Sequence, residues 1–179
     1  MHSINVETFL FMNGFAGTSS IVDQVFLFIT NPLMFIILAS VSMWVFIIAP
    51  LTSRDSYERL DAFKKALFFL ICLFIVWSVV EFLKGFVSFP RPHEYLHGIR
   101  TLLVYGEYDS FPSLHAAFSF ALATIIYYRS KRVGILLYGV ATLVALSRVY
   151  VGVHFPLDVI VGALIGVCIP WALRSFFKN

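Results

Sequence analysis

Long apolar stretches separated by short polar segments dominate this chain of 179 residues. A helix that crosses a bilayer needs about 20 mostly apolar residues. Hydrophobic residues make up 60% of the sequence and charged residues only 13%, whereas charged residues are about 25% of a soluble domain. The sequence therefore predicts an all-α integral membrane bundle with about five transmembrane helices. Four runs reach the required length and a fifth is shorter, at about residues 32–51, 66–88, 133–150, 157–177 and 112–128.

The N-terminal part fits this pattern least well. Residues 4–16 are apolar but short, and we expect the segment 1–20 to form a helix that lies in the membrane interface. The next apolar segment meets Asn31-Pro32, and a proline disfavours helical geometry in the residue before it. We expect a break there, with one tilted and kinked helix over 21–51 as the alternative. The whole chain, 1–179, is expected to form a single domain.

The distribution of basic residues predicts the orientation in the membrane. We expect loops at 53–65 and 129–132. These loops and the C-terminal end carry four, three and two of the thirteen lysines and arginines. With five spans these segments share one side, and the positive-inside tendency makes that side cytoplasmic. This topology accounts for the net charge of +3 without nucleic acid as a partner. The other basic residues fall on the opposite face, towards the periplasm or cell exterior: Lys84, Arg91, Arg100 and Arg148.

Three motifs within residues 84–158 place polar side chains at the ends of apolar runs. Ionisable groups at the edge of a bilayer are costly, so they usually mark a site. An arginine presents paired donors that match two phosphate oxygens, and a helix N-terminus attracts anions. The motifs therefore predict a phosphate pocket formed by Lys84, Arg91, Ser113 and Arg148. They read Lys84 to Arg91-Pro92, then Pro112-Ser113-Leu114-His115, then Ser147-Arg148 to His154 and Asp158.

The same motifs contain candidate catalytic groups. His154 and Asp158 are four residues apart, and in a helix they would project from one face. A carboxylate bonded to one imidazole nitrogen leaves the other nitrogen as a nucleophile. His115, when protonated, could give a proton to a leaving oxygen. A simpler interpretation remains open for Asp158 and for Ser113, because either could only cap a helix.

Two further interpretations concern metal and headgroup binding. His115, His154 and Asp158 are all possible metal ligands, but the surrounding cationic side chains would repel a metal ion. We therefore expect no metal and no other cofactor. Arg100, in the polar segment 89–110, is a candidate contact for a second phosphate or a sugar headgroup.

Together the three motifs resemble the signature of the type 2 phosphatidate phosphatase superfamily, which includes membrane lipid phosphatases and soluble vanadium haloperoxidases. The resemblance implies that His154 becomes phosphorylated, that Asp158 orients it, and that His115 protonates the leaving group, without a metal. It also implies that the four residues of the expected pocket bind the phosphate. The usual glycine between serine and histidine is Leu114 here. Leucine would be strained at a positive φ but costs little in a first helical turn.

The resemblance implies an integral membrane phosphatase that hydrolyses a phosphate monoester or pyrophosphate of a membrane lipid. The compact chain is similar to bacterial inner-membrane enzymes that act on undecaprenyl pyrophosphate, lipid A 1-phosphate or phosphatidylglycerophosphate, and an outward site favours the first two. Phosphatidate is a further alternative. The expected partners are this lipid and the bilayer, with no obligate protein partner. A non-hydrolytic phospholipid transporter or flippase and an inactive lipid-binding protein are the alternatives from other classes.

Overall fold

The computed structural model describes residues 3–31, 55–103 and 109–177, and every regular element in these ranges is helical. The expected all-α fold is confirmed. The apolar run 32–51 lies outside the described residues. The elements are α1 (Ser3–Asn13), α2 (Ser20–Thr30), α5 (Ser56–Val87), α6 (Pro92–Tyr95), α7 (Leu114–Arg129), α8 (Lys131–Tyr150), α9 (Pro156–Leu173) and the 3₁₀ helix η2 (Arg174–Phe177).

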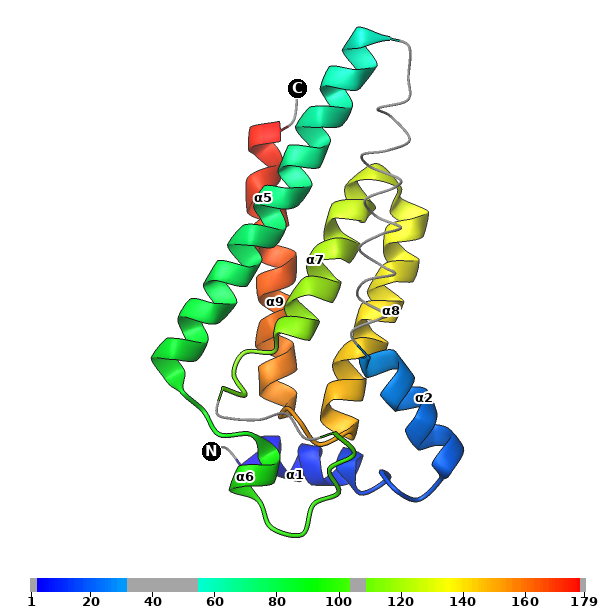
Figure 1. Ribbon diagram of the computed structural model, residues 1–179, viewed down its shortest axis with the longest axis vertical. Helices are drawn as coiled ribbons and strands as arrows, with labels where there is room; N and C mark the ends of the chain where they lie inside the picture. The colour runs from blue at the N-terminus through cyan, green and yellow to red at the C-terminus, as the bar shows by residue number, and fades with distance from the viewer. Residues whose placement is uncertain (1–2, 32–54, 104–108, 178–179) are drawn as a thin grey trace.

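Helix α7 is the centre of the bundle and packs against α5, α8 and α9 (Figure 1). Its inner face is built from small residues, including Ala116, Ala117 and Ala121, all fully buried. Small side chains let helix backbones approach closely. On α9, a Cβ added at Gly162 would lie 2.4 Å from the carbonyl oxygen of Ser113. The glycine therefore lets the start of α7, which carries one of the motifs, lie directly against α9.

Three helical stretches of the described residues are long and apolar enough to cross a membrane: Ser56–Tyr95, Lys131–Tyr150 and Pro156–Leu173. Helix α7 has only 16 residues and is shorter than such a stretch. The chain is thus a multi-pass membrane protein, and the expected number of five spans stays a prediction.

The start of α5 differs from the sequence-based expectation. The segment 53–65 was expected to be a loop before a span at 66–88, but α5 already begins at Ser56. The carboxylate of Asp55 caps the new start by accepting a hydrogen bond from the backbone N–H of Tyr57 at 2.9 Å, as N-cap residues do. Asp61 and Lys65 then form an ion pair one turn apart. Arg59, Lys64 and Lys65 therefore lie on the first turns of a helix, because capping and helical pairing outweigh the polarity of the segment.

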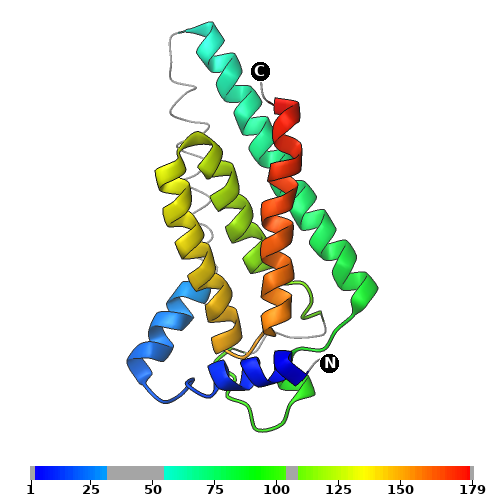
Figure 2. The same ribbon diagram turned by 180° about the vertical axis from the view of Figure 1, so that it is seen from behind.

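The N-terminal helices cover one end of the bundle. Figures 1 and 2 show α1 lying across the end at which α8 runs into α9, and the expected location of the segment 1–20 in the membrane interface stays a prediction. Phe9 of α1 is fully buried and contacts Phe155, with ring centroids 5.2 Å apart. Helix α2 ends at Thr30, and Asn31 is extended with ψ 138°. The break expected at Asn31 is therefore present. Most of the segment 21–51, for which one kinked helix was the alternative, lies outside the described residues.

Candidate active site

His154 and Asp158 meet without sharing a helix. His154 lies in the turn 151–154, and α9 begins only at Pro156, so the expected common helical face is wrong. The carboxylate of Asp158 accepts a hydrogen bond from the backbone N–H of Phe155 at 2.8 Å, which turns it back over the start of the helix. There Asp158 Oδ2 lies 3.5 Å from His154 Nδ1. Asp158 thus caps α9 and faces the imidazole at the same time.

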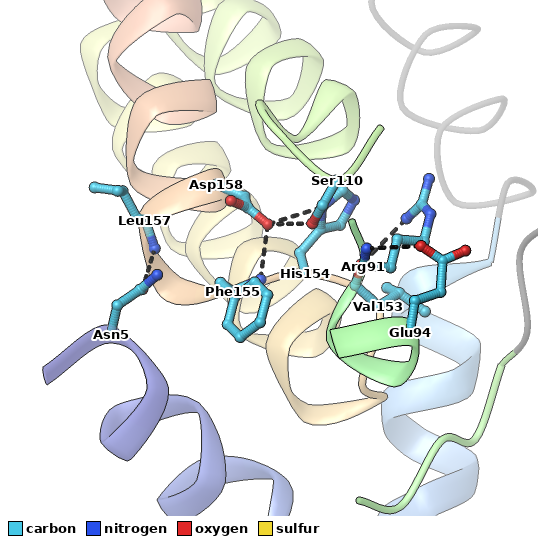
Figure 3. A network of polar contacts seen from close by, with 9 residues as sticks. All are labelled: Asn5, Arg91, Glu94, Ser110, Val153, His154, Phe155, Leu157 and Asp158. Carbon is cyan, nitrogen blue, oxygen red and sulfur yellow. Dashed lines mark hydrogen bonds and ion pairs between the residues drawn. The ribbon is translucent and has the colours of Figure 1, made fainter. Parts of the chain in front are cut away.

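Ser110 completes this arrangement, and sequence reasoning assigned it no role. Its hydroxyl donates to Asp158 Oδ2 and lies 3.4 Å from His154 Nδ1, as Figure 3 shows. The residue is fully buried, and its backbone N–H donates to the carbonyl oxygen of Phe89 at 2.8 Å. The only sequence signal was its position just before the Pro112–His115 motif. A serine there has no periodicity or spacing that distinguishes it from a loop residue.

The environment of His154 favours a neutral imidazole. Burial lowers the pKa of His154 to about 4, and the charge of Arg148 lowers it further, whereas the hydrogen bond with Asp158 acts in the opposite direction. Hydrogen bonding of the ring at Nδ1 fixes the tautomer that carries its proton there. The lone pair then lies on Nε2, the nitrogen on the far side of the ring from Asp158. This is the protonation state that a nucleophilic histidine needs.

Two arginines approach the same region from different elements. Arg91, which precedes α6, donates from Nη1 to the carbonyl oxygen of Val153 at 3.1 Å. Arg148, near the end of α8, is only 1% exposed and donates from Nη1 to Thr30 Oγ1 at 2.6 Å. Thr30, at the end of α2, was not among the expected site residues, and nothing in its local sequence indicates this contact.

His115 and Lys84 join the group. His115 stands in the first turn of α7, close enough to His154, Arg148, Lys84 and Arg91 to feel their charges. Lys84 lies in the last turn of α5 and pairs with Glu81 at 2.9 Å, as expected for neighbours on a helix surface. The structure therefore brings together both histidines and all three cationic side chains of the three motifs.

Ser113 and Leu114 form the start of α7. Ser113 is the N-cap residue, but its side chain makes no capping hydrogen bond. Its hydroxyl is buried and, within the part of the chain that the structure describes, has no hydrogen-bond partner, so the simple capping role does not apply. Its backbone N–H donates to the carbonyl oxygen of Asp158 at 3.0 Å. Leu114 is the first residue of α7 and does not have a positive φ, so the leucine is accommodated without strain.

Arg100 is held apart from this group. Its guanidinium donates from Nη1 to the carbonyl oxygen of Ala16. Its backbone is bound in both directions by Asn13, whose Oδ1 accepts from Arg100 N at 3.0 Å and whose Nδ2 donates to Arg100 O at 2.7 Å. The structure therefore places Arg100, within the loop 96–103, against the end of α1 and the residues that follow it.

The donor set of the site suits an anion. Among residues 3–31, 55–103 and 109–177, no three histidine, cysteine or acidic side chains lie together in a way that could hold a metal ion. Arg91 and Arg148 instead lie near a neutral imidazole that is backed by a carboxylate, and Lys84 lies near His115. Arginine and lysine stabilise the non-bridging oxygens of a phosphate, so the arrangement can bind a phosphate and attack it.

Comparisons with known proteins give the same class. The model of the PAP2 superfamily matches residues 65–179, which include all three motifs. A putative undecaprenyl-diphosphatase, YbjG of Escherichia coli (strain K12), is 30% identical over 171 residues, which cover 93% of this chain and 79% of that protein. The bacitracin transport permease protein BcrC of Bacillus licheniformis is 29% identical over 166 residues, covering 92% of this chain and 76% of that protein.

A solved structure supports the likeness in three dimensions. The crystal structure of Aquifex aeolicus LpxE superimposes with a TM-score of 0.76 at 27% identity, over 97% of this chain and 96% of that chain. The superposition thus includes the N-terminal helices as well as the motif-bearing part. Sequence match, motifs and fold agree, and the chain belongs to the PAP2 superfamily.

Proposed function

We propose that this protein is a metal-independent lipid phosphatase that works through a phosphohistidine on His154. The observation that carries the proposal is the buried pair of His154 and Asp158, which lies at one end of a membrane bundle with Arg91 and Arg148 nearby. Burial keeps the imidazole neutral and makes it a better nucleophile than a solvated histidine at acidic pH.

In the first step, His154 Nε2 attacks the phosphorus atom and the bond from phosphorus to the lipid oxygen breaks. His115, whose protonated form is favoured by the negative charge of the bound phosphate, gives its proton to that leaving oxygen. The attacking imidazole becomes cationic, and Asp158 stabilises it through Nδ1–H. Lys84, Arg91, Arg148 and the Ser113 hydroxyl hold the non-bridging oxygens, whose charge must be stabilised in the transition state.

In the second step, water attacks the phosphorus atom of the phosphohistidine. His115, now neutral, accepts a proton from this water as a general base. The nitrogen–phosphorus bond breaks, His154 regains its lone pair, and inorganic phosphate leaves. The lipid alcohol, or the lipid monophosphate when the substrate is a pyrophosphate, is the other product.

Undecaprenyl pyrophosphate and lipid A 1-phosphate are the leading substrates. The E. coli relative carries the name of an undecaprenyl-diphosphatase, which supports the first. The basic segments gather at the end of the bundle opposite the site, which by the positive-inside tendency directs the site outward from a bacterial inner membrane. Both lipids are reached from that side, whereas phosphatidylglycerophosphate and phosphatidate remain alternatives. Five spans are the expected topology, and we propose that Arg100 contacts a headgroup that extends beyond the phosphate.

The test is phosphate release by detergent-purified protein in EDTA, with farnesyl pyrophosphate, lipid A, phosphatidylglycerophosphate and phosphatidate as separate substrates. His154→Ala is expected to lower kcat by about 10⁴-fold or more, as loss of a nucleophile does. His97→Ala is the matched control, because His97 is an exposed loop histidine. Turnover that survives in purified His154→Ala protein would rule out the phosphohistidine, and one preferred lipid would identify the pathway.

A transport role is the second candidate, because the B. licheniformis relative carries the name of a transport permease. In that case the cations would hold a lipid phosphate or another anion without cleaving it. Reconstituted vesicles would then show movement of a fluorescent phospholipid between leaflets without phosphate release. Phosphate release that disappears in His154→Ala would instead favour the phosphatase.

A further inference from the structure

The end of α2 contributes a side chain to the site. We propose that Thr30 is a positioning residue that fixes the guanidinium of Arg148 for phosphate binding. This inference rests on the proposed function, because it assigns Thr30 a part in holding the phosphate of the same site.

The contact itself is buried and specific. Thr30 is fully buried and Arg148 is 1% exposed, and the two residues are 118 positions apart in the sequence. Arg148 Nη1 donates to Thr30 Oγ1 at 2.6 Å. A guanidinium is planar and its donors have a fixed geometry. Holding one nitrogen therefore restricts the direction in which the others can point, and a pre-oriented arginine binds the transition state better than a mobile one.

Helix α2 is held firmly enough to present Thr30. The ring of Phe26 stacks on Tyr150 with centroids 4.1 Å apart and an interplanar angle of 20°. The hydroxyl of Tyr150 donates to Asp23 Oδ1 at 2.8 Å. Tyr150 is the last residue of α8 and follows Arg148 by two positions. The end of α8 therefore contacts α2 both through Tyr150 and through Arg148. Figures 1 and 2 both show α2 beside this end of α8.

Thr30 and Arg148 come from different parts of the chain. The PAP2 match covers residues 65–179, so Thr30 lies outside the matched part while Arg148 lies inside it. Thr30 is also the last residue of α2, and the C-terminal end of a helix favours a nearby cation. The N-terminal segment is thus assigned a part in the site beyond covering it.

The first experiment compares Thr30→Val, which keeps the shape but removes the acceptor, with Thr30→Ser, which keeps the hydroxyl. Thr30→Val is expected to lower kcat/KM by about 10-fold to 100-fold, the range for a hydrogen bond to a charged group, and Thr30→Ser to restore most of it. Thr124→Val is the matched control, since Thr124 is a buried threonine within α7 that hydrogen-bonds to Phe120 O at 2.7 Å. Equal activity of Thr30→Val and the control would overturn the inference.

The second experiment separates positioning from a general structural effect. Inorganic vanadate, an analogue of the phosphoryl group in transfer, is used as an inhibitor in a double-mutant cycle. Thr30→Val should raise the Ki for vanadate about 10-fold in the parent protein. In an Arg148→Lys background it should hardly change the Ki, because Thr30 acts through the guanidinium that this background lacks. The same increase in both backgrounds would show that Thr30 acts independently of Arg148 and would overturn the inference.

A third measurement does not depend on activity. If the parent protein hydrolyses no lipid phosphate, the proposed function fails, and thermal unfolding of Thr30→Val, Arg148→Met and the double variant still tests the contact. Non-additive shifts in Tm support it. Additive shifts overturn the inference independently of the proposed function.

Discussion

The two ends of the helical bundle carry charge in opposite ways. At the end where α5 begins and α7 meets α8 (Figure 1), the basic side chains are exposed; they include Arg59, Lys64, Arg129, Lys131 and Arg132. At the other end, Arg148, His154 and Asp158 are at most 2% exposed. Each of these buried groups contacts another polar group, such as Thr30 or Ser110.

The difference shows which charges are held in place by the fold. An exposed lysine or arginine is solvated and contributes little to stability. Its positive charge can still direct the orientation of the protein in the membrane. A buried charge must be paired or hydrogen-bonded, because its desolvation is otherwise very unfavourable. A group buried at such a cost in a membrane protein usually has a function. Substitutions matched between the two ends can therefore test the comparison.

The largest effect is expected for Asp158→Asn, compared with Asp61→Asn at the opposite end. Asparagine can still accept the hydrogen bond from Phe155 N and cap α9, but it cannot stabilise a cationic His154. We expect kcat/KM to fall by about 10³-fold to 10⁴-fold, as when the orienting carboxylate of a triad is replaced, with little change in Tm. Asp61→Asn, which removes only an exposed pair with Lys65, should change activity less than about two-fold. Similar activities in the two variants would contradict the comparison.

A smaller loss is expected for Ser110→Ala, compared with Ser130→Ala. Ser110 donates to Asp158 Oδ2, and its removal leaves a buried carboxylate with one partner fewer. We expect kcat/KM to fall about 10-fold to 100-fold, because a hydrogen bond to a charged group is lost. Ser130, the N-cap of α8, makes no side-chain capping bond, so its replacement should leave phosphate release unchanged. A fully active Ser110→Ala enzyme would show that the hydroxyl does not position the pair.

The pH profile should distinguish the buried histidine from a solvated one. Because burial lowers the pKa of His154 to about 4, the neutral nucleophile persists as the pH falls and is lost only near pH 4. A histidine with an ordinary pKa of about 6.5 would lose about 10-fold in kcat/KM by about pH 5.5. We expect little loss at that pH once the titration of the substrate phosphate, followed by phosphorus NMR, is taken into account. A fall in kcat/KM centred near pH 6.5 would mean that burial of His154 at this end of the bundle does not lower the pKa of the nucleophile.

The smallest effects are expected at the first residues of two helices. Leu114→Gly removes a side chain that packs against the buried cluster of Val76, Val80, Ala117 and Ala121, so it should lower the free energy of unfolding by about 2 kcal/mol through lost burial and helix propensity. Lys131→Gly, at the exposed start of α8, should cost about 1 kcal/mol or less. Activity should stay within about three-fold in both, because Leu114 already has helical geometry. A large gain in activity with glycine would indicate that leucine impairs the phosphate site.

Much of the candidate site follows from residues that are near each other in the sequence. The cationic side chains and histidines of the motifs were identified from their positions at the ends of apolar runs, and the structure brings them together. Whether leucine is strained at position 114 also depends on a local feature, because a leucine in the first turn of α7 has helical geometry. The start of α5 differs from the prediction although its signals are local: the Asp55 cap and the Asp61–Lys65 pair extend the helix into a polar segment.

The sequence by itself determined that the chain is an all-helical membrane protein, and it predicted a phosphate site at one end, since hydrophobic runs and motif spacing are local properties. Only the tertiary structure decided how that site is supported. Ser110 reaches Asp158 across 48 positions and Thr30 reaches Arg148 across 118. Such contacts depend on how helices pack and where turns direct the chain, and a hydroxyl residue has the same local pattern whether it faces solvent or a buried arginine.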